Sequence, residues 1–255
     1  MAEQNLLLIL SLLPFAASLA LLSLSHTAGR AAAWVAGLTL TAGVAILIGF
    51  RTIIATGGSL TANMDWVPSI GLNLTLRLDG FSWLFTVLVL AIGILVVIYA
   101  RYYMEGQDRM PRFFALLMAF TGAMQGILIS GNILMMVVFW ELTSVISFLL
   151  IGFWHQSAAA RDGARTALMI TALGGLCLLV AMLIIGNIVG SYDLERVLAS
   201  GDIIRESPLY GAALTLFLLG AFTKSAQFPF HFWLPGAMAA PTPVSAYLHS
   251  ATMVK

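Results

Sequence analysis

The chain alternates between long apolar stretches and shorter polar connections. Seven stretches approach or reach the roughly 20 apolar residues that a helix needs to cross a membrane. They cover about residues 5–24, 31–50, 80–100, 112–130, 132–153, 165–190 and 209–228. An eighth begins near Pro243, but the residues up to Lys255 would extend only about 20 Å as a helix. We therefore predict an all-α integral membrane protein, a polytopic transmembrane helix bundle, whose natural chain continues past Lys255.

Two connections are long enough to predict structure outside the membrane. In residues 51–79, leucines recur at alternate positions between Leu72 and Leu78, which is the period of a β-strand. We predict a small external β-hairpin in this loop. Residues 191–208 carry charged side chains among apolar ones. They are expected to form a short amphipathic helix on the same side as the hairpin.

Composition restricts the class of protein further. Hydrophobic residues make up 60% of the chain and charged residues only 9%, whereas a soluble domain carries roughly 25% charged residues. The formal net charge of +1 gives no support for nucleic-acid binding. The single cysteine, Cys177, excludes a disulfide framework and an iron–sulfur cluster. We therefore expect no cofactor and no metal, and any redox chemistry would belong to another chain.

The arginines predict an orientation in the membrane. The loops after the first, third and fifth stretches contain Arg30, Arg101, Arg109, Arg112, Arg161 and Arg165. The loops after the second, fourth and sixth stretches contain fewer arginines, namely Arg51, Arg77, Arg196 and Arg205. Because arginine-rich loops remain in the cytoplasm, we expect the first set of loops to be cytoplasmic and the N-terminus to lie outside.

Three ionisable side chains fall within apolar stretches. Glu141 lies roughly 14 Å into the stretch that begins at Asn132, and the only two lysines are Lys224 and Lys255. A charge at the membrane centre costs about 2.5–3.5 kcal/mol, and such residues mark ion or proton paths. Arginine keeps its proton at accessible pH, whereas a buried lysine can release it. This segregation of lysines from arginines predicts a proton carrier.

A buried glutamate and lysine can also simply hold two helices together. Lys255 and His249 argue against that alternative, because two lysines and one glutamate do not neutralise each other. At least one lysine would then work partly deprotonated, or a further part of the protein would supply its partner. His249 titrates near neutral pH and can link the two lysines. His231 is a weaker candidate.

Prolines interrupt the seventh stretch just after Lys224. Pro229 has no N–H and clashes with the preceding turn, so we expect the helix to break near Gln227–Phe228. Non-helical backbone at membrane depth persists where protein or water surrounds it, and such breaks recur in ion-coupled transporters. The alternative is that residues 229–243, which include Pro241, form an ordinary loop beyond the membrane.

Small polar side chains accompany the two central charges. They could hold water files between the ionisable groups, or they could serve only in helix packing, and the sequence leaves both interpretations open. The supporting residues are Thr143, Ser144, Ser225 and Gln227. The paired glycines of "ALGGL" are interpreted as packing residues.

Four segments carry a resemblance to a known family: "ARYYMEG", "FWELTS", "TKSAQFPFHFWLPGAM" and "PTPVSAYLHSATMVK". In these segments the chain resembles the antiporter-like membrane subunits shared by respiratory complex I and Mrp antiporters, and most of all the large A-type subunits of Mrp-type Na⁺(K⁺)/H⁺ antiporters. The resemblance implies the first half of an inverted-repeat antiporter-like fold with a broken seventh helix. It implies three leading helices and the external hairpin in residues 1–110, and the first repeat, incomplete, in residues 111–255.

The resemblance also implies roles for individual residues. Glu141 matches the family's fifth-helix glutamate, Lys224 its seventh-helix lysine and His249 its eighth-helix histidine, while Lys255 matches a lysine of many members. We predict a subunit that carries protons through a Glu141–Lys224–His249–Lys255 relay, in which Glu141 and Lys224 form a switchable ion pair. It would act with other subunits of a monovalent cation (Na⁺ or K⁺)/proton antiporter in a bacterial inner membrane. An isolated chain of this length is not expected to transport.

The sequence leaves two alternatives for the function. The chain could be a proton-pumping membrane subunit of complex I or of a membrane-bound hydrogenase, because the local site would have the same residues. It could also be a membrane scaffold whose charges are idle. Neither alternative makes the chain an enzyme by itself.

Overall fold

The computed structural model describes residues 2–25, 28–106 and 109–250. Six of its helices are long and apolar enough to cross a membrane. They are α1 (Ala2–Leu22), α2 (Gly29–Ala55), α3 (Gly80–Tyr103), α4 (Met110–Ile129), α5 (Ile133–Ile151) and α6 (Ala158–Val189). A shorter apolar helix, α9 (Tyr210–Lys224), follows them. The predicted polytopic helix bundle is confirmed.

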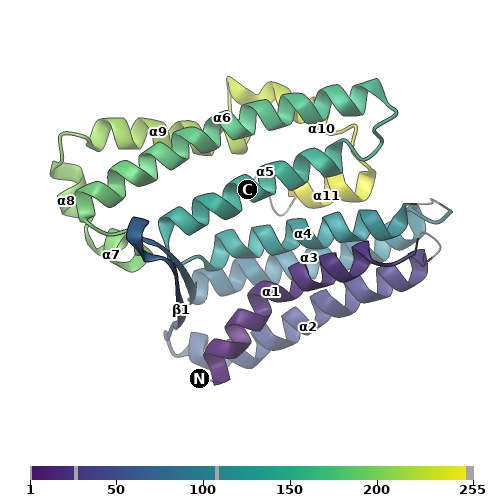
Figure 1. Ribbon diagram of the computed structural model, residues 1–255, viewed down its shortest axis with the longest axis horizontal. Coiled ribbons are helices and arrows are strands. Elements are labelled where there is room, and N and C mark those ends of the chain that lie inside the picture. The colour runs from purple at the N-terminus through teal and green to yellow at the C-terminus, as the bar shows by residue number, and fades with distance from the viewer. Residues whose placement is uncertain (1, 26–27, 107–108, 251–255) are drawn as a thin grey trace.

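The long helices run side by side along the longest axis of the molecule (Figure 1). Helix α4 lies at the centre of the bundle and packs against α1, α2, α3 and α5, and most of its residues are buried. Helix α6 packs against α5 on one side and α9 on the other. Helix α5 therefore lies between the central helix α4 and the outer helices α6 and α9.

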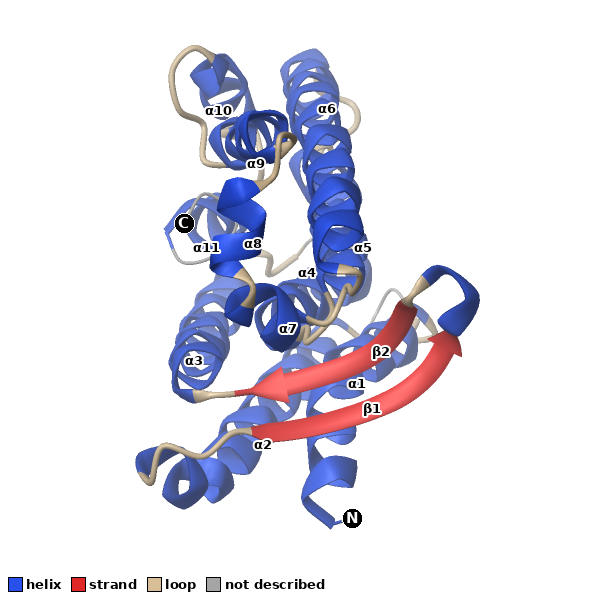
Figure 2. Cartoon of the chain, turned by 90° about the vertical axis from the view of Figure 1, so that its left-hand side faces the viewer, coloured by secondary structure: helices blue, strands red, loops and turns tan. Residues whose placement is uncertain are grey.

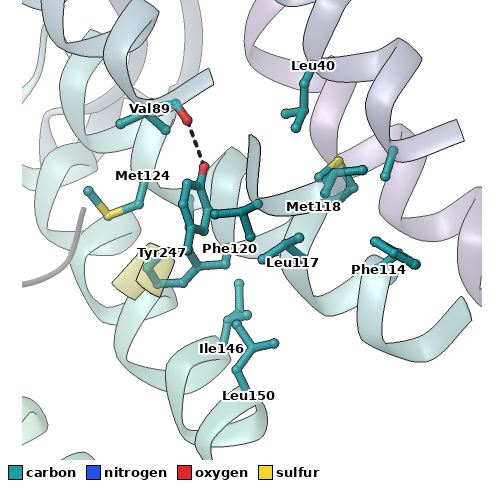
Figure 3. Packing of buried hydrophobic residues seen from close by; sticks show 14 of the residues in the cluster. Leu40, Val89, Phe114, Leu117, Met118, Phe120, Met124, Ile146, Leu150 and Tyr247 are labelled. Carbon is teal, nitrogen blue, oxygen red and sulfur yellow. Dashed lines mark hydrogen bonds between the residues drawn. The ribbon is translucent and has the colours of Figure 1, made fainter. Parts of the chain in front are cut away.

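Helix α11 (Thr242–Ser250) is anchored in this core. The Tyr247 side chain is fully buried, and its hydroxyl donates to the Val89 carbonyl at 3.1 Å (Figure 3). The Thr121 hydroxyl lies 3.0 Å from the same hydroxyl oxygen of Tyr247. The aromatic ring of Tyr247 meets Phe120 edge to face. These contacts fix the depth of α11 next to α3 and α4.

The predicted β-hairpin in residues 51–79 is confirmed. Strands β1 (Leu60–Val67) and β2 (Leu72–Leu78) pair antiparallel, with Leu60 opposite Leu78. The turn between them contains a short helix, η1 (Pro68–Ile70), and closes at Gly71, whose φ of 71° favours glycine. Figure 2 shows the hairpin crossing one end of the helix bundle.

The first turn of α3 follows the hairpin directly. The Asp79 carboxylate accepts a hydrogen bond from the Ser82 backbone N–H at 2.9 Å, and the Ser82 hydroxyl accepts one from the Asp79 N–H at 2.8 Å. This reciprocal capping box satisfies two backbone donors at the start of the helix. Arg77 forms an ion pair with Asp79 at 2.8 Å. The last strand and the third spanning helix are thereby joined rigidly.

The segment 191–208 forms two short helices where one was predicted. They are α7 (Leu194–Ala199) and α8 (Gly201–Glu206), separated at Ser200. Glycine at position 201 disfavours continuation of α7, because it has the highest backbone entropy to lose in a helix. The predicted location on the hairpin side is correct: Asp193 forms a backbone bridge with Asn132, whose side chain donates to the Gly71 carbonyl at 2.9 Å.

The predicted break of the seventh helix is confirmed, but it lies earlier than expected. Helix α9 ends at Lys224 rather than near Gln227–Phe228, and Ala226 then adopts a positive φ of 51°. The reason is that a proline clashes with the carbonyl of the residue four positions before it, which for Pro229 is Ser225. The helix ends immediately before that residue.

Two short helices continue the chain beyond the break: η2 (Phe230–Phe232) and α10 (Trp233–Ala237). Helices α9 and α10 lie one after the other along α6 (Figure 1). Gly236 contacts Gly163 in the second turn of α6, close to the end that carries Arg161 and Arg165. The residues after the break thus cover the remaining length of α6 rather than forming a loop detached from the bundle.

Candidate functional site

Lys224 is the best-enclosed charged side chain in the described part of the chain, with 3% of its surface exposed. Its ammonium group donates to the Thr143 hydroxyl at 2.7 Å, the Ser144 hydroxyl at 2.8 Å and the Trp140 carbonyl at 3.1 Å. It also lies 5.3 Å from the centre of the Trp140 ring. All of these partners come from one face of α5, near the middle of that helix.

The number and orientation of these acceptors suit a protonated lysine. An ammonium group has three donors and no acceptor, and Lys224 has three oxygen acceptors. The Thr143 hydroxyl donates its own hydrogen to the Trp140 carbonyl at 2.7 Å, which leaves its lone pairs for the lysine. The corresponding bond from Ser144 is long, at 3.4 Å. The Ser144 hydroxyl is therefore free to rotate and to donate to a neutral amine instead.

Glu141 neighbours this face of α5 but does not pair with the lysine. No ion pair or hydrogen bond joins Glu141 to Lys224, although both residues belong to the described part of the chain. Its Oε1 atom is buried without a hydrogen-bond partner. The predicted switchable Glu141–Lys224 ion pair is thus not formed in this structure. The physical reason is that neutral oxygens of α5 already occupy all three donors of the ammonium group.

The Glu141 carboxylate instead lies against α6. A β carbon on Gly175 would overlap Oε1 of Glu141, and a β carbon on the adjacent Gly174 would overlap the Thr223 hydroxyl. Gly174 and Gly175 thereby provide the space for the residue before Lys224 and for the carboxylate. These two glycines, interpreted from the sequence as packing residues, shape the site directly.

A related signal in the sequence could have identified this role. Glycine in a helix interior costs about 1 kcal/mol relative to alanine, so two consecutive glycines in an apolar span indicate close approach of another group. Gly220 on α9 supports that interpretation, since a β carbon there would lie 2.9 Å from the Gly174 carbonyl oxygen. Helices α6 and α9 therefore approach closely beside the lysine.

Trp233 closes the broken end of α9. Its side chain is fully buried, and the indole N–H donates to the Thr223 carbonyl at 2.9 Å. That carbonyl belongs to the last turn of α9, where helix carbonyls lack partners within the helix. The Trp233 ring lies 6.3 Å from the His249 ring, centre to centre. One aromatic side chain therefore lies between the turn that carries Lys224 and the predicted relay histidine.

His249 lies on α11 and is half-buried. Both of its ring nitrogens are buried without a hydrogen-bond partner. A buried imidazole with two unpaired nitrogens is poised to bind water or a proton-carrying group. Lys255 lies outside the described residues, so the last member of the predicted relay has no position here.

The remaining predicted residues divide into two groups. The Ser225 hydroxyl is partly buried and donates to the Ala221 carbonyl at 2.7 Å, and Pro241 is buried where α11 begins. Gln227, Pro229 and His231 lie at the exposed break, and the His231 ring stacks on Phe228. The structure thus brings Thr143 and Ser144 to Lys224, but it places Gln227 and His231 on the outside of the bundle.

No group of three or more His, Cys, Asp or Glu side chains close enough to hold a metal ion occurs within residues 2–25, 28–106 and 109–250. The chemistry that this arrangement supports is the protonation and deprotonation of a buried amine. Its neighbours are hydroxyls that can both accept and donate, and a carboxylate lies nearby without a partner.

The chain matches two family models. Residues 130–255 match the family described as NADH:quinone oxidoreductase/Mrp antiporter, TM. Residues 66–114 match NADH-Ubiquinone oxidoreductase (complex I), chain 5 N-terminus. The first match includes every residue of the site described above, and the second includes the end of β1, all of β2 and α3, and the start of α4.

Curated relatives show the same relationship over most of the chain. The chain is 59% identical over 252 residues to the A/B subunit of a probable K(+)/H(+) antiporter of Rhizobium meliloti (strain 1021), a match that covers 99% of this chain and 25% of the relative. It is 47% identical over 215 residues to the A1 subunit of the Na(+)/H(+) antiporter of Staphylococcus haemolyticus (strain JCSC1435), covering 83% of this chain and 27% of the relative.

A solved structure shares the fold. The Mrp complex from Dietzia sp. DQ12-45-1b aligns with a TM-score of 0.87 and 33% identity, covering 98% of this chain and 27% of that one. The chain thus spans about a quarter of the length of the relatives it matches. The resemblance to A-type Mrp subunits is confirmed. On these matches, the chain belongs to the antiporter-like membrane protein family that NADH:quinone oxidoreductase and Mrp antiporters share.

Proposed function

We propose that this chain is part of the A-type subunit of an antiporter complex that exchanges Na⁺ or K⁺ for protons. In this segment, Lys224 is the group that holds and releases the transported proton. The observation that carries the proposal is the surroundings of Lys224: a buried amine whose three direct partners are uncharged oxygens. The relatives named above are antiporter subunits, which supports the same class of function.

The physical argument rests on the balance between the two protonation states. A charge at the membrane centre costs about 2.5–3.5 kcal/mol on insertion scales, and three hydrogen bonds offset part of that cost. No carboxylate pairs directly with the ammonium group, so loss of the proton does not leave a partner charge uncompensated. The rotatable hydroxyls of Thr143 and Ser144 can accept from the charged form and donate to the neutral form.

Glu141 supplies the proposed switch. Its carboxylate has an unpaired oxygen against Gly175, one residue away from the Trp140 carbonyl that accepts from Lys224. If the carboxylate turns toward the lysine, attraction at about 4 Å and an effective dielectric of 20 amounts to roughly 4 kcal/mol. That is equivalent to about three pH units of proton affinity. Closing of the pair would retain the proton on Lys224, and opening would release it.

We propose that the released proton passes to His249 and then to Lys255. The position of His249 across the Trp233 ring from the end of α9 supports this order. Thr143, Ser144 and Ser225 would support the path. Gln227 and His231 are exposed at the break, so they would support the path from its edge. Pro229 and Pro241 act through the backbone, by ending α9 and starting α11.

We also propose two structural parts for the chain and an orientation in the membrane. Residues 1–110 would form the leading helices with the external hairpin, and residues 111–255 the first antiporter-like repeat. The protein would lie in the bacterial inner membrane with its N-terminus and hairpin outside, as the arginine distribution favours. The other subunits of the complex would be its partners.

The decisive experiment replaces Lys224 in the complete antiporter complex. Lys224→Arg keeps a positive charge but cannot release its proton at accessible pH. We expect it to abolish cation-driven proton movement in everted membrane vesicles while all subunits still assemble. Arg51→Lys, at an exposed position on α2, is the matched control and should transport normally. Normal transport by the Lys224→Arg complex would refute Lys224 as the proton carrier.

A further inference from the structure

A polar cavity of about 530 Å³ lies between the hairpin and the segment that follows α6. The hairpin contributes Asn63, Asn73 and Thr75, the start of α5 contributes Asn132, and the segment after α6 contributes Ser191 and Asp193. The cavity is therefore on the hairpin end of the bundle (Figure 2), far along α6 and α9 from Lys224.

The lining of this cavity is rich in oxygen and carries a single formal charge. Asp193 is the one acidic residue among the lining residues, and none of them is basic. Oδ1 of Asp193 accepts from the Arg196 backbone N–H at 3.1 Å, where it caps α7. The capping bond uses Oδ1 of Asp193 and not the second carboxylate oxygen.

A second observation points to a missing partner. Oδ1 of Asn73, which lines the same cavity, is buried and has no hydrogen-bond partner. A buried amide oxygen without a partner costs roughly 1–3 kcal/mol. Its neighbour on the paired strand differs, because Oδ1 of Asn63 accepts from the Thr75 hydroxyl at 3.0 Å. The hairpin therefore holds one unsatisfied acceptor in a residue that lines the cavity.

Helix termini add partial charges of both signs: α6 ends at this cavity, whereas α5 and α7 begin there at their caps, Asn132 and Asp193. Gly190, which ends the 32-residue helix α6, is among the lining residues. Backbone carbonyls at a helix C-terminus carry a partial negative charge that attracts cations. The nearest arginine of the hairpin, Arg77, already pairs with Asp79 and lines a different, more apolar pocket. Arg196 is exposed in the first turn of α7 and does not line this cavity.

We propose that this cavity binds a monovalent alkali cation and keeps part of its hydration shell. Carboxylate, amide and hydroxyl oxygens are ligands of hard cations. One formal negative charge with several neutral oxygens matches a single positive charge better than a divalent ion, whose sites usually collect several carboxylates. The identity of the ion as transported cargo rests on the proposed function, whereas the binding itself does not.

In the antiporter, this site concentrates the cation at the hairpin end of the helix bundle. A cleft lined by one sign of charge raises the local concentration of the opposite ion and its rate of entry. Loss of the site would then raise the apparent KM for the cation and leave the maximal rate nearly unchanged. The proton-carrying residues near Lys224 would not be affected.

The test uses the complete complex with Asp193→Asn, because asparagine also caps helices and so preserves the start of α7. Asn73→Ala is the second variant. Asp202→Asn is the matched control: it removes the same charge from α8, where the carboxylate is 90% exposed and does not line the cavity. The first readout is ²³Na NMR relaxation of NaCl with detergent-solubilised complex, which reports binding without transport. The second is the KM for Na⁺ and K⁺ in proteoliposomes.

We expect Asp193→Asn to weaken Na⁺ binding and to raise the cation KM by at least about fivefold, as removal of the only formal charge implies. Asn73→Ala should act in the same direction, and Asp202→Asn should match the wild type. Equal binding by the Asp193→Asn and Asp202→Asn complexes would overturn the proposal. Displacement of Na⁺ by equimolar Ca²⁺ would also overturn it, because the site would then favour divalent ions. Complexes that bind Na⁺ but perform no exchange would contradict the proposed function and not this site.

Discussion

The carboxylate of Glu141 on α5 lies directly over Gly175 on α6, where a β carbon would overlap its Oε1 atom. This contact places the only acidic side chain of α5 against the helix that also accommodates Thr223, the residue before Lys224. The position of the carboxylate is therefore set by the absence of a side chain on a neighbouring helix.

The first prediction concerns that glycine. Gly175→Ala should displace the Glu141 carboxylate and reduce antiport by the complete complex roughly tenfold, because a misplacement of about 1 Å in a reacting group can cost more than that. Gly49→Ala is the control, since no atom lies within 4 Å of a β carbon there. Transport is measured as cation-dependent collapse of a pH gradient in vesicles. Equal rates in the two variants would show that the position of Glu141 is not critical.

The second prediction concerns the acceptors around Lys224. Removal of one oxygen by Ser144→Ala, or by the nearly isosteric Thr143→Val, should destabilise the protonated amine, since a hydrogen bond to a charged group contributes about 1.5–3 kcal/mol. We expect the pH dependence of antiport to shift by roughly one unit toward lower pH. Ser147→Ala is the matched control, because the Ser147 hydroxyl donates to the Ser144 carbonyl and does not contact Lys224. An unshifted profile in both test variants would contradict the role of the hydroxyls.

The third prediction concerns the end of the broken helix. Trp233→Phe keeps a buried ring but removes the donor to the Thr223 carbonyl. The carbonyl still accepts a long hydrogen bond from the Ala226 N–H, at 3.4 Å. Loss of the indole hydrogen bond should cost about 0.5–1.5 kcal/mol, and we expect both a lower thermal-unfolding midpoint and slower antiport. Trp66→Phe, at a 58% exposed position of β1, should change neither measurement. If Trp233→Phe lowers stability alone, the residue supports the fold but does not position Lys224.

The fourth prediction concerns pH and the start of α3. Burial tends to raise the pKa of Asp79, but hydrogen bonds from Ser82 and the nearby Arg77 guanidinium outweigh it, and the pKa is lowered below its usual value. A carboxyl group with a lowered pKa in the folded state stabilises the fold above its unfolded pKa. That contribution is lost as the pH falls through the folded pKa.

Two substitutions separate the cap from the charge. Asp79→Ala should destabilise the complex by about 1 kcal/mol at neutral pH, as expected for the loss of a helix cap. Asp79→Asn should retain most of the cap but lose the dependence on acidic pH. Thermal unfolding between neutral and acidic pH measures both effects. An Asn variant that loses stability on acidification as steeply as the wild type would contradict this assignment.

Most of the fold could be predicted from local patterns. Spanning helices require long apolar runs, so the approximate bounds of the six long helices followed from composition along the chain, as strand β2 followed from its alternating leucines. The seventh predicted stretch forms only the shorter helix α9. Boundaries were less certain: α2 extends to Ala55, and segment 191–208 forms two helices. The break after Lys224 was expected three residues too late, because the clash of Pro229 acts on Ser225 rather than on the residue next to it.

The candidate site was predicted only in part. Glu141 and Lys224 were identifiable because ionisable residues are rare and costly in apolar spans. Their pairing was predicted from their opposite charges and the family resemblance, and it is not formed in this structure, where Lys224 uses the Trp140 carbonyl and two hydroxyls. The indole of Trp233 had no local sequence signature that could assign it to the site, and the consecutive glycines of α6 had one that was interpreted as helix packing.

The amino-acid sequence by itself determined the membrane class, the order of the helices, the position of the break to within one turn and the residues able to carry a proton. These properties depend on hydropathy, on the geometry of proline and on side-chain chemistry, all of which act over a few residues. Only the tertiary structure decided which atoms meet. The contacts of Lys224 with Thr143 and of Glu141 with Gly175 join separate helices, and they depend on how far each helix is rotated and how closely small residues allow it to approach its neighbour.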